Sequence, residues 1–266
     1  MDFQNLTFIF VFYTYRTKYA MTETNNQYNP SLSVDCVIFG FDSKQLKILL
    51  VERSGPYQTN PQLKLPGSLV LKNTKLEVYA NQVLKELTGL NEIYLKQFYT
   101  FGNPDRIKTP EDIEWIENTY QVTIERVVSI SYYSLVKIDQ YNLNLSEESY
   151  HAKWYNISDI HELAFDHMEI MKKGLEALRQ ELIYNPLICF ELLPEKFSLR
   201  ELQDTYESIQ GIEYDNRNFR KKIGKAKYII QLNEKQLGVA HKPALLYKFD
   251  KEQYQTNRLE LIKFFI

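Results

Sequence analysis

The chain has 266 residues, a length that favours two modest domains over a single one. Hydrophobic residues make up 44% of it and charged residues 25%, a balance that excludes a disordered chain. The formal net charge of −2 is uneven, because residues 196–250 hold eleven Lys and Arg against seven Asp and Glu. A basic segment beside an acidic remainder indicates two partners of different kinds.

Residues 1–29 are expected to form a disordered or mis-annotated tail. The apolar run at 6–15 is too short to span a bilayer, and it lacks the basic start and the small-residue cleavage pattern of a signal peptide. We therefore predict no membrane segment and expect translation to begin at Met21, with export as the alternative. Cys36 and Cys189 form neither a CxxC pair nor a disulfide framework, which indicates reduced thiols in a cytoplasmic protein.

Residues 30–185 are predicted to form one α/β domain with a mixed sheet. Runs of β-branched, aromatic and other apolar residues predict strands at 33–41, 46–51, 94–101 and 127–136, of which the first two form a hairpin. Apolar periodicity predicts helices at 76–89, closed by Gly89, and at about 166–182. Loops are expected around Pro56, Pro61 and Pro66 and over the charged residues 104–125. A proline-containing break at 185–195 marks the domain boundary.

Residues 186–255 are predicted to form a winged helix-turn-helix, followed by a tail at 256–266. Ser198 and Glu201 have the spacing of a capping box, and the helix they open ends at Gly211. Asp215 is an N-cap for a second helix at 216–226, in which Phe219 and Ile223 are four residues apart on an apolar stripe. Strands at 228–232 and 245–249 complete the wing.

The second of these helices is basic, and we expect it to lie in the major groove of double-stranded DNA. Arg and Asn side chains can pair with purine edges, and Lys with phosphates, while the wing reaches the DNA backbone or minor groove. The candidate DNA-binding residues are Arg217, Asn218, Arg220, Lys221, Lys222, His241 and Lys242. The alternative is that this helix merely presents a solvated charged face.

Residues 65–68 (LPGS) and the helix at 76–89 resemble the Nudix signature Gx5Ex7REUxEExGU, in which U is aliphatic. Setting Gly89 and Leu90 on its end aligns Ser68 with the first glycine and Thr74 with the first glutamate. The REUxEE core then falls on residues 82–87, where Glu86 remains but Gln82, Val83 and Leu87 replace charged residues. The resemblance implies a Nudix-type α/β/α sandwich.

The loss of signature carboxylates at positions 83 and 87 affects metal binding and catalysis. The resemblance implies hydrolysis of nucleoside diphosphate linkages with Mg²⁺ held by helix carboxylates, and positions 83, 86 and 87 share one helix face. Because two of the three are apolar, we predict no metal site, no cofactor and a catalytically inactive domain. A relocated metal site that uses carboxylates between Glu111 and Glu125 is the alternative.

The resemblance extends to Nudix-related transcriptional regulators over residues of about 30–250. It rests on 98–106 (FYTFGNPDR), 127–136, Trp154, 163–167 (LAFDH) and the C-terminal segments FSLRELQ, NFRKKI and KPALLYKF. It implies an operator-binding homodimer whose degenerate Nudix domain senses a sugar or an ADP-ribose-type compound, with the apolar helix most similar to the branch that includes arabinose regulators. Residues 106–126 depart from the family, in which a short link is expected.

Six residues are candidates for the effector pocket because a Nudix fold places them at strand or loop positions that face its cleft: Asp35, Arg53, Phe101, Asp105, Tyr132 and His167. Each also has a structural interpretation, as a core residue, a turn or a helix start. Three functions follow from the sequence. The first is a DNA-binding regulator, the second a Mg²⁺-dependent hydrolase of ADP-ribose or a related nucleotide sugar, and the third a module whose basic helix binds an acidic protein.

Overall fold

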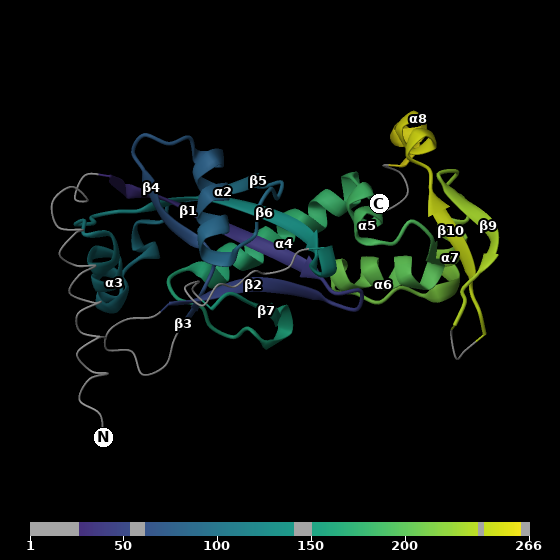
Figure 1. The fold of residues 1–266 in the computed structure, drawn as a ribbon, viewed down its shortest axis with the longest axis horizontal. Helices are drawn as coiled ribbons and strands as arrows, with labels where there is room; N and C mark the ends of the chain where they lie inside the picture. The colour runs from purple at the N-terminus through teal and green to yellow at the C-terminus, as the bar shows by residue number, and fades with distance from the viewer. Residues whose placement is uncertain (1–26, 54–61, 141–150, 239–241, 262–266) are drawn as a thin grey trace, which may run out of the picture.

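A mixed sheet of seven strands forms the centre of the N-terminal part of the computed structural model, which describes residues 27–53, 62–140, 151–238 and 242–261 (Figure 1). Its strands are β1 (Tyr28–Phe41), β2 (Leu46–Arg53), β3 (Gln62–Lys64), β4 (Gly67–Leu71), β5 (Lys96–Phe101), β6 (Val128–Lys137) and β7 (Lys153–Asn156). The four predicted strands are confirmed. Two short ones, β3 and β4, lie where only a proline loop was expected, and Pro56 and Pro61 fall outside the described residues.

Strand β1 is the spine of the sheet. It pairs antiparallel with β2 and β4 and parallel with β6, in the order β3-β2-β1-β6-β5. In this register Asp35 lies opposite Gly67 on β4 and Ser131 on β6. A single acidic residue is therefore fixed where three strands meet.

Helix α2 (Leu76–Thr88) covers one face of the sheet and α4 (His167–Tyr184) the other (Figure 1). Because side chains alternate across a strand, β1 supplies both cores. Val34, Cys36 and Ile38 belong to the cluster around α2, whereas Val37, Phe39 and Phe41 belong to the cluster around α4. The α/β class and the mixed sheet are confirmed.

The segment expected to be a loop at 104–125 contains a short 3-10 helix, η2 (Pro104–Arg106), and an α-helix, α3 (Pro110–Tyr120). The expected loop was wrong because the many charged residues of this segment outweighed the signals for the start of a helix. The Thr109 side chain accepts a hydrogen bond from the Asp112 amide at 3.1 Å, and Pro110 occupies the first helical position, where its missing N–H costs nothing. Two more 3-10 turns, η3 (Ile138–Gln140) and η4 (Ile157–Asp159), flank β7.

The C-terminal part contains α5 (Leu187–Leu192), β8 (Phe197–Ser198), α6 (Leu199–Gln210), α7 (Asn216–Ile223), β9 (Ile229–Lys235), β10 (Leu245–Phe249) and α8 (Lys251–Leu261). The capping box is present: Glu201 N–H donates to Ser198 Oγ at 3.2 Å, and Ser198 N–H donates to the Glu201 carboxylate at 2.7 Å. Gly211 ends α6 in the left-handed region with φ 70°. Strands β8, β10 and β9 form the small sheet of the wing.

Helices or strands lie at three of the expected domain boundaries, which stay predictions. Residues 256–261, expected as a tail, continue α8, whose Tyr254 is buried against Tyr228. Tyr28 and Asn29 already belong to β1, which leaves residues 1–26 of the expected tail, with Met21, outside the described residues. The break at 185–195 contains α5 and carries a continuous core, since one cluster runs from Leu182 through Cys189 and Leu192 to Leu202.

Candidate functional site

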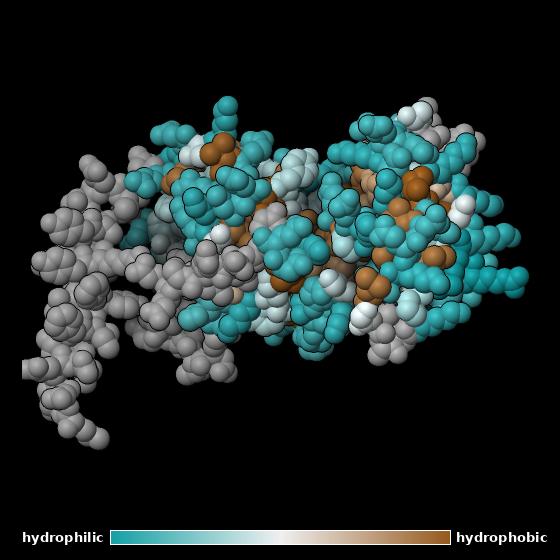
Figure 2. All heavy atoms as spheres, turned by 45° about the vertical axis from the view of Figure 1, so that its right-hand side comes forward, coloured by the Kyte–Doolittle hydropathy of each residue, from teal (hydrophilic) through white to brown (hydrophobic). Residues whose placement is uncertain are grey.

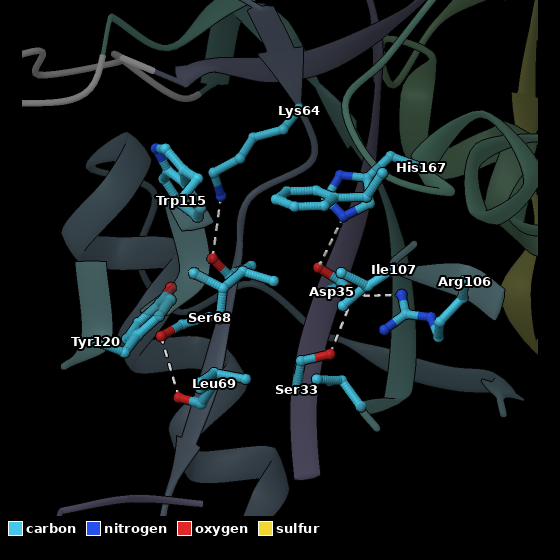
Figure 3. Close-up of a pocket in the computed structure, with 14 residues that line it drawn as sticks. Ser33, Asp35, Lys64, Ser68, Leu69, Arg106, Ile107, Trp115, Tyr120 and His167 are labelled. Carbon is cyan, nitrogen blue, oxygen red and sulfur yellow. Dashed lines mark hydrogen bonds and ion pairs between the residues drawn. The ribbon is translucent and has the colours of Figure 1, made fainter. Parts of the chain in front are cut away.

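A small pocket opens beside Asp35 at the meeting point of β1, β4, η2, α3 and the start of α4 (Figure 3). Its polar lining includes Asp35, Lys64, Arg106 and His167, and α3 contributes the aromatic wall with Trp115. The cavity volume is about 40 Å³, which holds a few water molecules but is far below the roughly 300–1,000 Å³ of ligand pockets. The cavity in this structure is therefore smaller than a nucleotide-sized ligand requires.

Asp35 is held between a histidine and an arginine. Its carboxylate lies 3.4 Å from His167 Nε2 and 3.7 Å from Arg106 Nη2, and it accepts a hydrogen bond from Ser33 (Figure 3). It also accepts a hydrogen bond from Ser129. Burial raises the pKa of this carboxyl, but His167, Arg106 and Ser129 together outweigh it and hold the pKa below its ordinary value. Asp35 is therefore a buried, charged acceptor.

His167 is fixed as one tautomer. The Leu65 amide donates to its Nδ1 at 2.9 Å, so the ring proton is on Nε2, which faces Asp35. Burial lowers the pKa of His167 to about 4, so the ring is neutral at pH 7 and its contact with Asp35 is then a hydrogen bond and not an ion pair.

A pH dependence of stability follows from His167. Between pH 4 and 6.5 the unfolded chain binds a proton that the native state does not, so the free energy of unfolding should rise with pH across this window, by about 3 kcal/mol in all. Urea unfolding at several pH values should show this rise in the wild type and a shallower one in His167→Asn. The exposed His161→Asn is the matched control, and equal slopes for His167→Asn and the wild type would contradict the assignment.

Lys64 lines the pocket, where its ammonium group lies over the Trp115 ring, 5.9 Å from the ring centre, and donates hydrogen bonds to backbone carbonyls. Its Nζ donates to the carbonyls of Leu65 at 3.2 Å and Gly67 at 3.1 Å, and burial lowers its pKa to about 8. Gly67 lets β4 lie close to β1 beside Asp35, because a Cβ there would lie 2.1 Å from Asp35 Oδ1 and 2.7 Å from the Val34 carbonyl oxygen. The glycine of the LPGS segment thus has a packing role at this pocket.

Helix α3 is attached to the sheet through Arg53. The buried guanidinium forms an ion pair with Asp112 and donates to the Glu111 carbonyl at 2.9 Å. It also lies over the rings of Trp115 and Phe165, at 5.1 and 4.7 Å from their centres. Arg53 therefore supports the aromatic wall of the pocket from behind.

The six predicted pocket residues separate into three groups. Asp35 and His167 line the pocket, and Arg53 lies behind its wall. Phe101 and Tyr132 are buried in the cores on opposite faces of the sheet, and Asp105 is exposed in the η2 turn, so these three do not line it. Sequence reasoning missed Lys64, Arg106 and Trp115. A lysine inside the apolar run LKLP was a usable signal for Lys64, whereas Arg106 and Trp115 belong to the segment interpreted as a loop.

The degenerate Nudix helix keeps a carboxylate at one of the three positions that the Nudix signature assigns to metal binding, 83, 86 and 87. On α2, Val83 is buried and Leu87 half-buried in the core, while Glu86 is exposed and accepts a hydrogen bond from Gln82 Nε2 at 2.9 Å. Thr74 is half-buried in the turn before the helix. Within the described ranges no group of three or more His, Cys, Asp and Glu side chains could hold a metal ion, and this includes the carboxylates of α3. These residues do not fit Mg²⁺, which prefers several oxygen ligands.

The basic side chains of α7 lie on the outside of the winged helix. Arg217, Asn218, Arg220, Lys221 and Lys222 are exposed, and Figure 2 shows that this end of the molecule is largely hydrophilic. Phe219 and Ile223 anchor the helix, with Phe219 packing against Tyr206 at 6.0 Å. Asp215 caps it by accepting from the Asn218 amide at 2.9 Å. In the wing, Lys242 is exposed, whereas His241 lies outside the described residues.

The basic helix, its capped partner helix and the wing coincide with a known domain. The model of the NrtR DNA-binding winged helix domain matches residues 189–249. These residues form an NrtR-type winged helix. The match begins inside α5 and ends with β10, so it includes α7 and both strands of the wing, where the candidate DNA-binding residues lie.

Relatives extend the likeness to the rest of the chain. The ADPR responsive transcriptional repressor NtrR of Acinetobacter baylyi is 27% identical over 249 residues, which cover 92% of each protein. The structure of Shewanella oneidensis NrtR complexed with a 27mer DNA is 26% identical, with a TM-score of 0.60 over 84% of this chain and 95% of that one. A MutT/nudix family protein from Enterococcus faecalis is 23% identical and has the same fold, with a TM-score of 0.59 over 89% of this chain and 92% of that one.

The resemblance to Nudix-related transcriptional regulators is thus confirmed over both parts of the chain. None of these three relatives is named for arabinose, so that branch stays a prediction. No helix among the described residues is long and apolar enough to cross a membrane.

Proposed function

We propose that this chain is a DNA-binding repressor whose affinity for its operator changes when an ADP-ribose-type compound binds the Nudix-like domain, and that this domain does not hydrolyse the compound. The observation that carries the proposal is the combination in one chain of an exposed basic helix α7 and a Nudix helix α2 with apolar side chains at two of its three ligand positions. The A. baylyi relative, named as an ADPR responsive repressor, supports it over nearly the whole chain.

The pocket offers chemistry that suits such a compound. The buried Asp35 carboxylate can accept hydrogen bonds from ribose hydroxyls, and the Arg106 and Lys64 cations favour phosphate oxygens. Trp115 and Phe165 present aromatic faces on which an adenine ring can stack. Because the cavity is only about 40 Å³, we expect α3 to move outward as the ligand enters.

Catalytic inactivity is tested by incubation with ADP-ribose and Mg²⁺. We expect no AMP above the buffer control when the products are separated by chromatography, because a single carboxylate at Glu86 can neither neutralise the pyrophosphate charge nor activate water. AMP release that needs Mg²⁺ and disappears in Glu86→Gln would instead establish a hydrolase. The exposed Glu77→Gln on the same helix is the matched control.

We further propose that the protein binds DNA as a homodimer in the cytoplasm. Two winged helices related by a two-fold axis would read a palindromic operator, and the Nudix-like domains can supply the symmetric interface. Sedimentation of the free protein and of the DNA complex gives the subunit number directly. The alternative effector is a sugar such as arabinose, which a screen for ligands that bind the protein would identify.

A further inference from the structure

One long helix connects the pocket to the DNA-binding helices. Helix α4 has 18 residues and is therefore about 27 Å long. It begins at the pocket with Asp166 and His167 and ends beside α6 of the winged helix (Figure 1). Because the helix is regular and hydrogen-bonded throughout, a displacement of its first turn also displaces the end that contacts α6.

At the pocket end, α4 is tied to the groups that line the cavity. Asp166 accepts hydrogen bonds from Arg106 Nε at 2.8 Å and Arg106 Nη2 at 2.7 Å, while His167 contacts Asp35 and Leu65. Arg106, Asp35 and His167 all line the pocket. A ligand that competes for Asp35 or Arg106 therefore acts directly on the first turn of α4.

The middle of α4 packs closely against the sheet. Gly174 faces Val37 of β1, and a Cβ at this glycine would lie 3.2 Å from three atoms of the valine side chain. Val37 is two residues from Asp35 on the same strand. The helix can thus shift along the sheet only together with its packing contacts.

At the far end, α4 is bonded to α6 through Arg179. Arg179 Nε donates to the Ile209 carbonyl at 2.9 Å, in the last turn of α6, and the Arg179 carbonyl accepts from Gln210 Nε2 at 3.3 Å. The guanidinium lies against Gly211, where a Cβ would be 2.5 Å from Nη2. A cation at the carboxyl end of a helix is electrostatically favourable, so Arg179 closes α6 as well as attaching it.

The position of α6 in turn fixes α7. Gln203 Nε2 donates to the Tyr214 carbonyl at 2.9 Å, and the Tyr214 amide donates to Glu207 at 2.8 Å, which holds the turn before α7. Arg179 also lines a groove of about 690 Å³ that lies between α6 on one side and the β1–β2 turn and η4 on the other. The two domains are packed on one side and open on the other, an arrangement that lets α6 pivot.

We propose that α4 transmits occupancy of the pocket to α6 and α7, and that Arg179 is the positioning residue through which the movement passes to the winged helix. The identity of the effector in this inference rests on the proposed function. The coupling itself can be tested without the effector, because coupling between two binding sites is reciprocal. If ligand at the pocket moves α7, DNA at α7 must change the pocket.

The test uses the full-length protein and a duplex selected by the wild type from a random library. Hydrogen exchange is measured on the pocket segments 104–107 and 164–168 with and without that duplex. We expect the duplex to change exchange there in the wild type, and this change to disappear in Arg179→Ala and Arg179→Gln while their duplex affinity stays within about threefold. Lys173→Ala is the control, since Lys173 is an exposed residue of the same helix and forms an ion pair with Glu176 of that helix at 3.0 Å.

A wild type whose pocket segments do not respond to the duplex, or an Arg179→Gln variant that responds as the wild type does, overturns the proposal. A second readout is the ratio of duplex Kd values with and without ADP-ribose, which should fall below about twofold in both Arg179 variants. If ADP-ribose does not bind the wild type, the proposed effector is wrong, and the exchange measurement still decides whether Arg179 couples the two sites.

Discussion

Replacing Asp112 with alanine should lower the free energy of unfolding by about 3–5 kcal/mol, because it leaves the Arg53 charge buried without its partner. Arg53 is 1% exposed and is surrounded by Trp115 and Phe165, so water cannot replace the lost carboxylate. The same change should loosen α3 and the pocket wall. Urea unfolding followed by circular dichroism measures the first effect, and tryptophan emission reports the second.

Two neighbouring variants separate the charge from other effects. Asp112→Asn keeps an oxygen acceptor for Arg53 and should cost less than the alanine. Asp105→Ala removes an exposed carboxylate from the preceding turn and should change stability by no more than about 0.5 kcal/mol. An Asp112→Ala protein as stable as Asp105→Ala would show that Arg53 does not depend on this ion pair.

The double substitution Arg217→Ala and Arg220→Ala should weaken specific DNA binding by about a hundredfold or more, because each arginine that pairs with a base contributes roughly 1–3 kcal/mol. Both side chains are exposed on α7, whose fold depends on Phe219 and Ile223, so the variant should keep its thermal stability. Fluorescence anisotropy with a labelled duplex at several salt concentrations measures the affinity and the salt slope.

The roles of arginine and lysine on α7 can be distinguished. Lys221→Ala with Lys222→Ala should weaken binding to all sequences alike and reduce the salt slope by about 2, as expected for phosphate contacts. Lys85→Ala with Lys172→Ala makes the same charge change on the Nudix-like part, where both lysines are exposed, and should leave binding nearly unchanged. If the two arginines matter no more than this remote pair, α7 does not read the DNA.

Local signals in the sequence predicted most of the elements. Helices α2, α6 and α7 have clear stop or cap residues at Gly89, Ser198 and Asp215, and β1 and β6 are continuous β-branched and aromatic runs. Helices α3 and α8 were missed because both are polar and each is held by few buried residues, chiefly Ile116 for α3 and Tyr254 for α8. The Thr109-Pro110 start of α3 was visible but was outweighed by the surrounding charges.

The pocket was predicted less completely than the fold. Asp35 and His167 were found because a strand aspartate and a helix-start histidine are recognisable locally. Arg53 pairs with Asp112 across 59 residues, and Arg106 pairs with Asp166 across 60, so nothing in the local pattern shows that these cations are buried. Such long-range pairs become visible only once the chain is folded.

The central claim is that one protein binds DNA by sequence and changes that binding when ADP-ribose occupies its Nudix-like domain. Anisotropy titration of a selected duplex and a random duplex, at moderate salt and with or without ADP-ribose, tests it most directly. We predict clear preference for the selected duplex and a change in its Kd of at least about fivefold on adding ADP-ribose, with no AMP formed. Equal affinity for both duplexes, or a selected-duplex Kd that ADP-ribose leaves unchanged, would contradict it.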